Sequence, residues 1–361
     1  MASLRRVDRL NGRGKRAWEV RYRDPEGRHR QRTFPTKPEA QRFARQVEVA
    51  KDERRFIDPR RGKVLFGEWA DRWEKAHPKR KATTVDARTR LMALYITPSF
   101  GSKQLSHIRP IDVQEFVTSL EDRGLSPSRV RNAYFVLKPC IDAAVASDYI
   151  SRSPCVGIKL PEPTHREMSF LSAEQVRSVA DAVPEQYRAL VYTLALGGLR
   201  WGEAVALRKE CVDLEAGLVR VRESCSEVNS VLHYGTPKSG KSRSVVLPRF
   251  VIEMLAERVE EVEDEAFVFT SPEGAPLRSP NWRRRVWAPA LKAAGLPPTI
   301  RIHDLRHTCA SLLANQGAHP KAVMEHLGHA SISTTIDRYS HLFPDEKDRI
   351  AKALDESFTT M

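Results

Sequence analysis

Long apolar runs are missing from this sequence: none approaches the roughly 18 residues that a membrane-spanning helix needs, so we expect no transmembrane segment. The first residues, MASLRRVDRLNGRGKRAWEV, lack the apolar stretch of a secretory signal. Cysteine is also scarce, and its five residues are not spaced as metal-ligand pairs (Cys140, Cys155, Cys211, Cys225 and Cys309). These absences argue against a membrane protein and against a disulfide-stapled secreted protein, and they favour reduced thiols in the cytoplasm.

The positive charge is unevenly distributed along the chain. The 361 residues carry a formal charge of +14, and a chain of this length favours two or three domains. Residues 1–63 contain 20 Lys and Arg against 9 Asp and Glu, whereas the rest of the chain contains 40 against 37. A basic module of this kind predicts a polyanionic partner, most simply nucleic acid. The alternative is a solvated basic tail, but Trp18, Tyr22 and Phe34 within a strand-like alternation argue against it.

The pattern of apolar residues predicts a small β-sheet backed by one helix in this basic part. AWEVRYR at 17–23 alternates as a half-buried strand does, and RHRQRTF at 28–34 can return as a second strand. The helix after this strand can be capped by Thr36. Its apolar face consists of Ala40, Phe43, Ala44 and Val47.

Residues 64–156 have helical periodicity throughout, with Trp69 and Trp73 expected in the core rather than as platforms for stacking bases. The proline-containing segment 154–170 has little periodicity and is typical of a linker. The chain from about residue 170 to its end mixes helical and strand-like patterns. We therefore predict a multidomain α+β protein: a small N-terminal domain of β-sheet plus helix over 1–62, an all-helical domain over 63–160, and a mixed, mainly α domain with a small β-sheet over 161–361.

GTPKSGKS at 235–242 matches the phosphate-loop pattern G-x-x-x-x-G-K-[ST] letter for letter. A phosphate loop must open a helix, because the helix N-terminus binds the phosphates. Here RSVVLP follows the loop and SEVNSVLHY precedes it, and both favour strands. We therefore expect a β-hairpin with Ser239 and Gly240 at its tip, presenting Lys238 and Lys241, rather than a nucleotide site.

Two further stretches place charged and basic side chains beside turns and on helices. In TLALGGLRWGEAVALRKECVDL a helix ends at Gly197, Arg200 follows the turn, and Glu203 lies in the first turn of the next helix. In IHDLRHTCASLLANQG, His303 and Arg306 lie one helical turn apart on the same face.

A third stretch, MEHLGHASISTTIDRYSHL, contains a histidine and a tyrosine. His329 follows a glycine turn, and Tyr339 lies on a short helix. The apolar side of that helix carries Ile332 and Ile336.

These residue types suit the cleavage of a phosphodiester. The guanidinium groups of Arg200 and Arg306 can hold its non-bridging oxygens and neutralise the transition state. A tyrosine hydroxyl, with a pKa of about 10, needs such cations and a base such as His303 in order to attack. The departing 5′-oxygen needs a proton, which Lys238 can supply. The resulting phosphotyrosine conserves the energy of the diester, so religation would need no ATP and no metal.

Together, LGGLRWGE, TPKSGKSRSVVLP, HDLRHT and LGHASISTTIDRY resemble the tyrosine recombinase (phage integrase) family. Each motif alone is weak, but four in this order, ending in a tyrosine near the C-terminus, are specific, and they cover about residues 170–345. The resemblance implies a site-specific DNA recombinase that cuts and rejoins double-stranded DNA through a 3′-phosphotyrosine, as a homotetramer on DNA. The helical segment then resembles a core-binding (SAM-like) domain, and the basic N-terminal segment resembles an arm-type DNA-binding domain.

The resemblance also implies a role for each candidate residue at the phosphate. Arg200 and Arg306 would clamp the scissile phosphate, and His329 would hydrogen-bond one of its oxygens. Glu203 would orient the site without touching the DNA.

The remaining implied roles concern the nucleophile and the protons. Tyr339 would be the nucleophile, and His303 would assist proton transfer from it. Lys238 would be the general acid, with Lys241 three residues away as the alternative.

The family also implies a setting: integration and excision of a mobile element such as a phage, in the cytoplasm of a bacterial host at the nucleoid. Neither cofactor nor metal is expected, and no membrane. A directionality factor and a host DNA-bending protein are candidate partners. An apolar stripe near the end of the chain predicts a helix that docks on its own domain or on a neighbouring protomer (Ile350, Leu354 and Phe358).

Three other interpretations compete with this one. His303 and His307 have the i, i+4 spacing of a zinc pair, but no Glu stands beside His303 as in H-E-x-x-H, and no cysteine is suitably placed. A type IB topoisomerase would share the chemistry but would not need the basic N-terminal module. A non-catalytic DNA-binding regulator would need the basic module but not Tyr339 with both arginines.

Overall fold

The computed structural model describes residues 2–10, 16–23, 27, 29–52, 61–76, 81–163, 168–238, 240–260, 263–339 and 355–356. The chain divides into two compact units, residues 1–165 and residues 166–361. None of the helices within the described ranges is long and apolar enough to cross a membrane.

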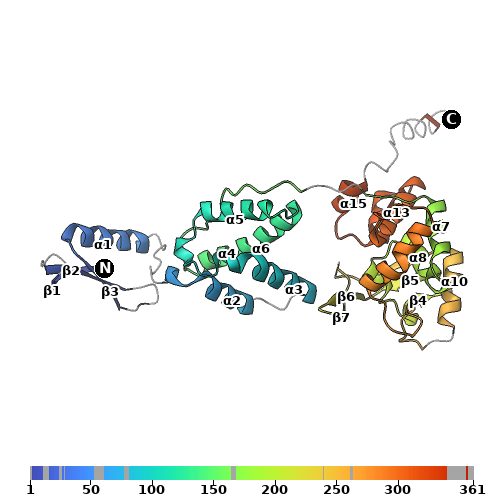
Figure 1. Cartoon of the computed structure of the whole chain (residues 1–361), viewed down its shortest axis with the longest axis horizontal. Helices are drawn as coiled ribbons and strands as arrows, with labels where there is room; N and C mark the ends of the chain where they lie inside the picture. Colours follow the sequence, from blue (N-terminus) through green and yellow to red (C-terminus); the bar gives the residue numbers. More distant parts are fainter. Residues whose placement is uncertain are drawn as a thin grey trace. The chain divides into compact units, whose positions relative to one another are not determined.

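The chain begins with a three-stranded antiparallel sheet and one helix. The elements are β1 (Ser3–Leu10), β2 (Arg16–Arg23), β3 (His29–Phe34) and α1 (Lys37–Asp52), in sheet order β1-β2-β3. The helix covers one face of the sheet (Figure 1), where Val20 and Tyr22 pack against Ala40, Ala44 and Val47. The predicted sheet and helix are confirmed, with β1 as an additional strand.

Alternate residues of a strand point to opposite faces of a sheet. The residues that alternate with the apolar ones are mostly polar, so the other face of this small sheet is polar. The pairs Arg5↔Glu19, Arg21↔Gln31 and Arg23↔His29 lie in register, out of phase with Val20 and Tyr22.

The rest of the first unit is helical, as predicted. Its elements are η1 (Arg61–Lys63), α2 (Phe66–Ala76), α3 (Ala82–Leu91), the π-helical turn η2 (Met92–Ile96), α4 (Thr97–Phe100), η3 (Leu105–His107), α5 (Pro110–Asp122) and α6 (Pro127–Ala146). Trp69 and Trp73 are buried, and Trp69 Nε1 donates to the Cys140 carbonyl at 2.8 Å. Both tryptophans are therefore core residues, as their spacing predicts.

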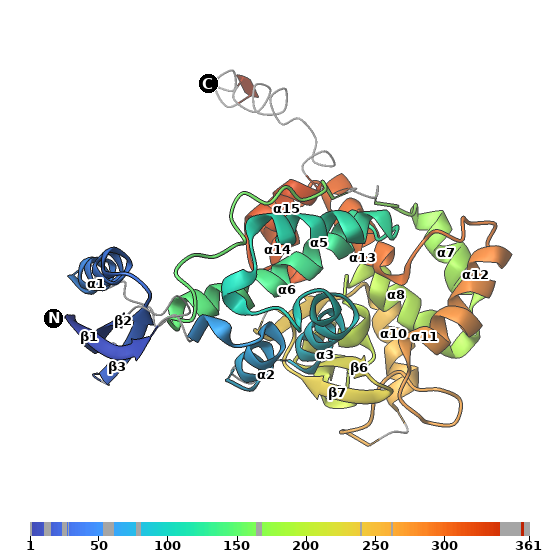
Figure 2. The same ribbon diagram turned by 60° about the vertical axis from the view of Figure 1, so that its left-hand side comes forward.

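The second unit is built mainly from helices. They are α7 (Ala173–Ala182), η4 (Glu185–Tyr187), α8 (Arg188–Leu196), α9 (Trp201–Ala204), η5 (Lys209–Cys211), α10 (Arg249–Val259), α11 (Ser279–Trp282), the π-helical turn η6 (Arg283–Trp287), α12 (Ala288–Ala293), α13 (Ile302–Asn315), α14 (Pro320–Leu327) and α15 (Ile332–Tyr339). The sequence of α8 is apolar all round, so this helix is buried, and α7, α10 and α13 pack around it (Figure 2).

Five short strands complete this unit: β4 (Val212–Asp213), β5 (Leu218–Val221), β6 (Ser224–Val228), β7 (Val231–Gly235) and β8 (Arg243–Val246). The sheet order is β4-β5-β8, while β6 and β7 form a separate hairpin. Its turn is Asn229-Ser230, where both φ angles are positive (48° and 65°), as a tight two-residue hairpin turn requires.

One expectation is wrong here. The strands on either side of GTPKSGKS do not pair with each other, because β7 is already paired with β6 and β8 pairs with β5. The described residues 236–238 and 240–242 therefore lie between strands of two different sheets and not in a hairpin turn, while Ser239, expected at the tip, lies outside the described ranges. The part of the prediction that excludes a phosphate loop is confirmed, since the segment leads into a strand and not into a helix.

The helix α15 has its buried side where the sequence pattern did not predict it. Ile332 and Ile336 are 41% and 43% exposed, whereas Thr335 and Tyr339 are fully buried. The expected C-terminal helix with Ile350, Leu354 and Phe358 falls on residues outside the described ranges.

Candidate active site

A buried carboxylate between two arginines forms the base of the site. Glu203, 1% exposed, accepts a hydrogen bond from Arg200 Nη1 at 2.8 Å and one from Arg243 Nη2 at 2.7 Å. Its second oxygen also accepts from the backbone N–H of Arg200 at 3.0 Å, which closes a capping box at the start of α9. Arg200 is thus fixed at both its backbone and its side chain.

The charge state of Glu203 follows from these contacts. Burial alone would raise the pKa of its carboxyl group, but the hydrogen bond and charge of Arg243, followed by the contacts with Arg200, outweigh it and lower the pKa to about 2. Glu203 is therefore a carboxylate at neutral pH.

Arg243 is a residue of the site that the sequence patterns did not identify. It opens β8, and besides bonding Glu203 it donates from Nε to the carbonyl of His326 at 3.2 Å. Gly328 lies directly against it: a Cβ there would come within 2.7 Å of Arg243 Cδ, and φ is +69°. Arg243 therefore joins α9 to the turn that carries His329. Only its place after the lysine segment TPKSGKSR hinted at this role.

The second clamp candidate, Arg306, lies on α13 and is 2% exposed. Its Nη1 donates to the carbonyl of Gly198 at 2.5 Å. That carbonyl is held by a glycine with φ +62°, at a position where a Cβ would meet Leu327 Cδ2 at 2.5 Å and Cys309 Sγ at 3.0 Å. Burial, and then the charge of Arg200, lower the pKa of Arg306 to about 9, so the guanidinium remains charged at neutral pH.

Within the described part of the chain, Arg306 Nη2 and Arg243 Nη1 are buried and make no hydrogen bond. Buried donors are nearly always satisfied in folded proteins. These two unbonded guanidinium donors, together with Arg200, could therefore bind the oxygens of an anion such as a phosphate.

His303 lies one turn before Arg306 on α13. The residue is exposed to solvent, yet partial burial of its ring, followed by the charges of His307, Arg306, Arg200 and Arg301, lowers its pKa to about 4. His303 is therefore neutral at pH 7. Its ring contacts that of His307 edge-on, with centroids 4.9 Å apart and planes at 83°.

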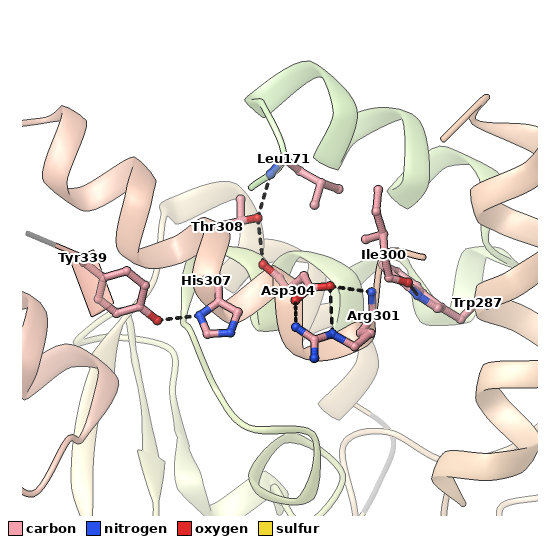
Figure 3. A network of polar contacts seen from close by, with 8 residues as sticks. All are labelled: Leu171, Trp287, Ile300, Arg301, Asp304, His307, Thr308 and Tyr339. Carbon is pink, nitrogen blue, oxygen red and sulfur yellow. Dashed lines mark hydrogen bonds and ion pairs between the residues drawn. The ribbon is translucent and has the colours of Figure 1, made fainter. Parts of the chain in front are cut away.

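Tyr339 is fully buried at the end of α15 (Figure 3). Its ring belongs to a small apolar cluster of Cys309, Ala310, Val323 and Leu327. Its hydroxyl lies 2.7 Å from Nδ1 of His307, a residue whose spacing in the sequence suggested only a zinc ligand. The structure thus places His307, and not His303, against the tyrosine hydroxyl.

The helix α13 that carries these residues is fixed by its own contacts (Figure 3). Asp304 accepts from the backbone and guanidinium of Arg301 at 2.7 Å each, which caps the helix start. Thr308 Oγ1 donates to the Asp304 carbonyl and accepts from the Leu171 N–H at 3.0 Å. These bonds tie α13 to the segment before α7, so the histidines and Arg306 stand on a rigid support.

His329 lies after Gly328 and its ring is parallel to that of Tyr339, with centroids 6.3 Å apart and planes at 10°. Its Nδ1 is 2.8 Å from Thr335 Oγ1. His329, Tyr339, His307 and His303 thus form one continuous row of rings.

Lys238 is the candidate that the structure does not bring to the others. It is exposed in the segment 236–242, and no hydrogen bond or ion pair joins it to another residue that the structure describes. Lys241 is exposed on the same segment.

Comparisons with known proteins show which family the chain belongs to. The model of the phage integrase family matches residues 169–346, and that of the N-terminal SAM-like domain of phage integrases matches residues 65–120. The ICEBs1 integrase of Bacillus subtilis (strain 168) is 30% identical over 278 residues, which are 73% of this chain and 74% of that protein. The chain belongs to the phage integrase family. A putative prophage phiRv2 integrase of Mycobacterium tuberculosis is 28% identical over 357 residues, 93% of this chain and 92% of its own.

Solved structures of other integrases share the fold of this integrase. The Tn1549 transposon integrase, in complex with a circular intermediate DNA, superposes with a TM-score of 0.70 at 20% identity, covering 82% of this chain and 100% of that one. A lambda integrase tetramer bound to a Holliday junction gives a TM-score of 0.61 at 18% identity, covering 90% and 96%. The predicted multidomain α+β fold class and the predicted family are both confirmed.

Proposed function

We propose that this site-specific recombinase cuts and rejoins DNA through a 3′-phosphotyrosine at Tyr339, for the integration and excision of a mobile element. The proposal is carried by one observation: α13 holds both a buried guanidinium with an unused donor, on Arg306, and the histidine bonded to the Tyr339 hydroxyl. The anion clamp and the nucleophile are thereby held by one helix.

Arg200 and Arg306 would bind the non-bridging oxygens of the scissile phosphate. Two guanidinium groups can neutralise the charge of a five-coordinate transition state, and the planar fork of arginine matches phosphate geometry. Glu203 would orient Arg200, which is supported by its two hydrogen bonds to that residue. His329 would hydrogen-bond a phosphate oxygen.

Lys238 would donate a proton to the departing 5′-oxygen, with Lys241 as the alternative on the same segment. Because Lys238 is exposed, it would reach the DNA only when the segment 236–242 folds over the bound phosphate. Such assembly of a site on substrate binding is common among enzymes with mobile loops. His303 would assist proton transfer from the tyrosine.

The parts of the chain would bind different DNA. Residues 1–62 would be an arm-type DNA-binding domain, residues 63–160 a core-binding domain, and residues 161–361 the catalytic domain. The polar face of the β1-β2-β3 sheet supports the first assignment, since it displays Arg5, Arg21 and Arg23. The SAM-like match at 65–120 supports the second.

Assembly and location extend the proposal. Four protomers would act together on two DNA duplexes, as the lambda integrase tetramer on a Holliday junction suggests. A directionality factor and a host DNA-bending protein would control the direction of the reaction. The protein would act at the nucleoid, in the cytoplasm of a bacterial host.

A covalent-trapping assay tests the central claim. Wild-type and Tyr339→Phe protein would be mixed with fragmented host and element DNA without ATP or metal, quenched in SDS, and the DNA attached to protein sequenced. We expect adducts with the wild type alone, concentrated at a few inverted-repeat sites, while the variant binds DNA with unchanged affinity.

Each of the other outcomes would favour a different nucleophile or a different function. Adducts formed by Tyr339→Phe would exclude this tyrosine as the nucleophile. Wild-type adducts spread over all sequences would favour relaxation of DNA in the manner of a topoisomerase. Tight binding without any adduct would favour a regulator.

A further inference from the structure

The residue in contact with the tyrosine hydroxyl has no role in the reaction described so far. His307 Nδ1 lies 2.7 Å from Tyr339 Oη, and the two residues are 5% and 0% exposed. This distance is within the range over which a side chain can take a proton directly. The pair comes from different helices, α13 and α15, and the two residues are 32 positions apart along the chain.

His303 is less well placed for the same task. It lies one turn earlier on α13, and its ring contacts that of His307 rather than that of Tyr339. Among the described residues, neither a ring contact nor a hydrogen bond joins His303 to Tyr339. The chain of contacts from the tyrosine hydroxyl to His303 therefore runs through His307.

We propose that His307 is a catalytic residue, the general base that accepts the Tyr339 proton. The inference rests on the proposed role of Tyr339 as the nucleophile. His307 would begin as the neutral tautomer with its proton on Nε2 and the Nδ1 lone pair towards the hydroxyl. This pairing makes the hydroxyl the donor and Nδ1 the acceptor.

The step balances without any further reactant. The Tyr339 O–H bond breaks as an N–H bond forms at His307 Nδ1, and Oη forms a bond to phosphorus. The bond from phosphorus to the 5′-oxygen breaks, and that oxygen takes a proton from the general acid. Religation is the reverse, with His307 returning the proton to Oη.

The surroundings of the pair support proton removal. His303, Arg306 and Cys309 stand on the same helix as His307, and the ring of His329 lies parallel to that of Tyr339. Arg306, the adjacent residue, interacts electrostatically with Tyr339, and its positive charge favours the phenolate. Arg306 is also the proposed phosphate ligand, so the base and the clamp are neighbours in sequence.

His307→Asn separates a base from a mere hydrogen-bond partner. The asparagine amide can occupy the position of Nδ1 and still bond the hydroxyl, but it cannot accept a proton at neutral pH. The rate to be measured is single-turnover formation of the covalent adduct. The substrate is a duplex with one cleavage site and a nick beside it, so that the cleaved end is lost and the adduct cannot religate. At pH 7 we expect this rate to fall by roughly 10²–10⁴-fold, with DNA affinity unchanged. Between pH 7 and 9 the variant's rate should rise about tenfold per unit, because phenolate must then form without a base.

His319→Asn is the matched control. His319 is exposed, caps α14 by accepting from the Lys321 N–H at 3.2 Å, and asparagine caps equally well. This variant should cleave at the wild-type rate. If thermal melting shows that His307→Asn is unfolded, His307→Gln is the second variant, with the same expectation.

The outcomes separate the base assignment from the nucleophile assignment. Wild-type or faster cleavage by a folded His307→Asn protein, with no adduct from Tyr339→Phe, would overturn the base assignment and leave the nucleophile intact. An adduct from Tyr339→Phe would overturn the nucleophile and the base together.

Discussion

At the scale of single residues, the site depends on a charge that is expensive to bury. Glu203 is 1% exposed, and a carboxylate is tolerated there because Arg200 and Arg243 both bond it. Removing one partner from a buried ion pair leaves an uncompensated charge. The triad therefore contributes to folding as well as to the placing of Arg200.

The lowered pKa of Glu203 predicts how stability changes with pH. The pKa falls from an ordinary 4.5 to about 2 on folding, so the unfolded chain binds the proton first as the pH decreases. The contribution of this carboxylate, about 3 kcal/mol, is complete above pH 4.5 and is lost as the pH falls towards 2. The unfolding free energies of wild-type and Glu203→Gln protein should therefore converge over this interval.

Thermal unfolding of both proteins between pH 5 and pH 2 measures this difference. Glu253→Gln is the control, because Glu253 is 62% exposed and its ion pair with Arg249 lies on the surface of α10. That variant should keep the wild-type pH dependence. A gap between wild type and Glu203→Gln that stays constant over the interval would contradict the assignment.

Some residues of the site could be predicted from their neighbours in the sequence, whereas others are brought together only by the fold. The sequence placed Arg200 with Glu203, and His303 with Arg306, because each pair lies three residues apart on a helix start or a helix face. Arg243 could not be predicted in this way, because it bonds to Glu203 although the two residues are 40 positions apart in the sequence. His307 was visible only as a possible zinc ligand, because its partner Tyr339 is brought to it by the packing of α14 and α15.

At the scale of elements, one glycine sets the distance between α9 and the β6–β7 hairpin. A Cβ at Gly202 would lie 2.2 Å from the Cys225 carbonyl oxygen and 2.8 Å from Ser224 Oγ. The first contact is with backbone and cannot be relieved by rotating a side chain. The hairpin leads directly into the segment with Lys238, so its position matters for the proposed acid.

Gly202→Ala should push β6 away from α9. We expect a loss of about 1–3 kcal/mol in unfolding free energy from overpacking, and slower covalent adduct formation because the lysine segment is displaced. Denaturant unfolding and single-turnover cleavage would measure the two effects. Gly235→Ala, at the end of the same hairpin, meets nothing within 4 Å and serves as the control. Equal behaviour of the two variants would show that the close approach has no consequence.

Helices and strands were predictable where the pattern of apolar residues is local. The pairing of strands was less predictable, because it depends on contacts between distant residues. The helices of residues 64–156 and the sheet with α1 follow from periodicity and caps. The strands beside GTPKSGKS were expected to pair because they are neighbours in sequence. Instead, the tight turn at Asn229-Ser230 pairs β7 with β6, and β8 pairs with the edge of β5 that β4 leaves open. Likewise, Ile332 and Ile336 have helical spacing, yet the buried side of α15 is decided by Tyr339 and its cluster.

At the scale of the whole molecule, the candidate catalytic residues and the excess positive charge lie in different parts of the chain. Every candidate catalytic residue from Arg200 to Tyr339 belongs to the unit 166–361. The excess positive charge lies in residues 1–63. Much of the affinity for DNA comes from phosphate contacts that release counterions, so the N-terminal part should control salt-dependent binding and the second unit should control cleavage.

Removing residues 1–62 should abolish binding to one class of DNA site and leave weak binding to the sites of cleavage. A finer test neutralises the polar sheet face with Arg5→Gln, Arg21→Gln and Arg23→Gln together. If each residue contacts one phosphate, the slope of log affinity against log salt should become shallower by roughly 3. The control removes equal charge from α1, with Lys37→Gln, Arg42→Gln and Arg45→Gln, all on the helix. A face that binds DNA loses affinity only in the first triple variant, whereas equal losses in both would mean that net charge alone attracts the DNA.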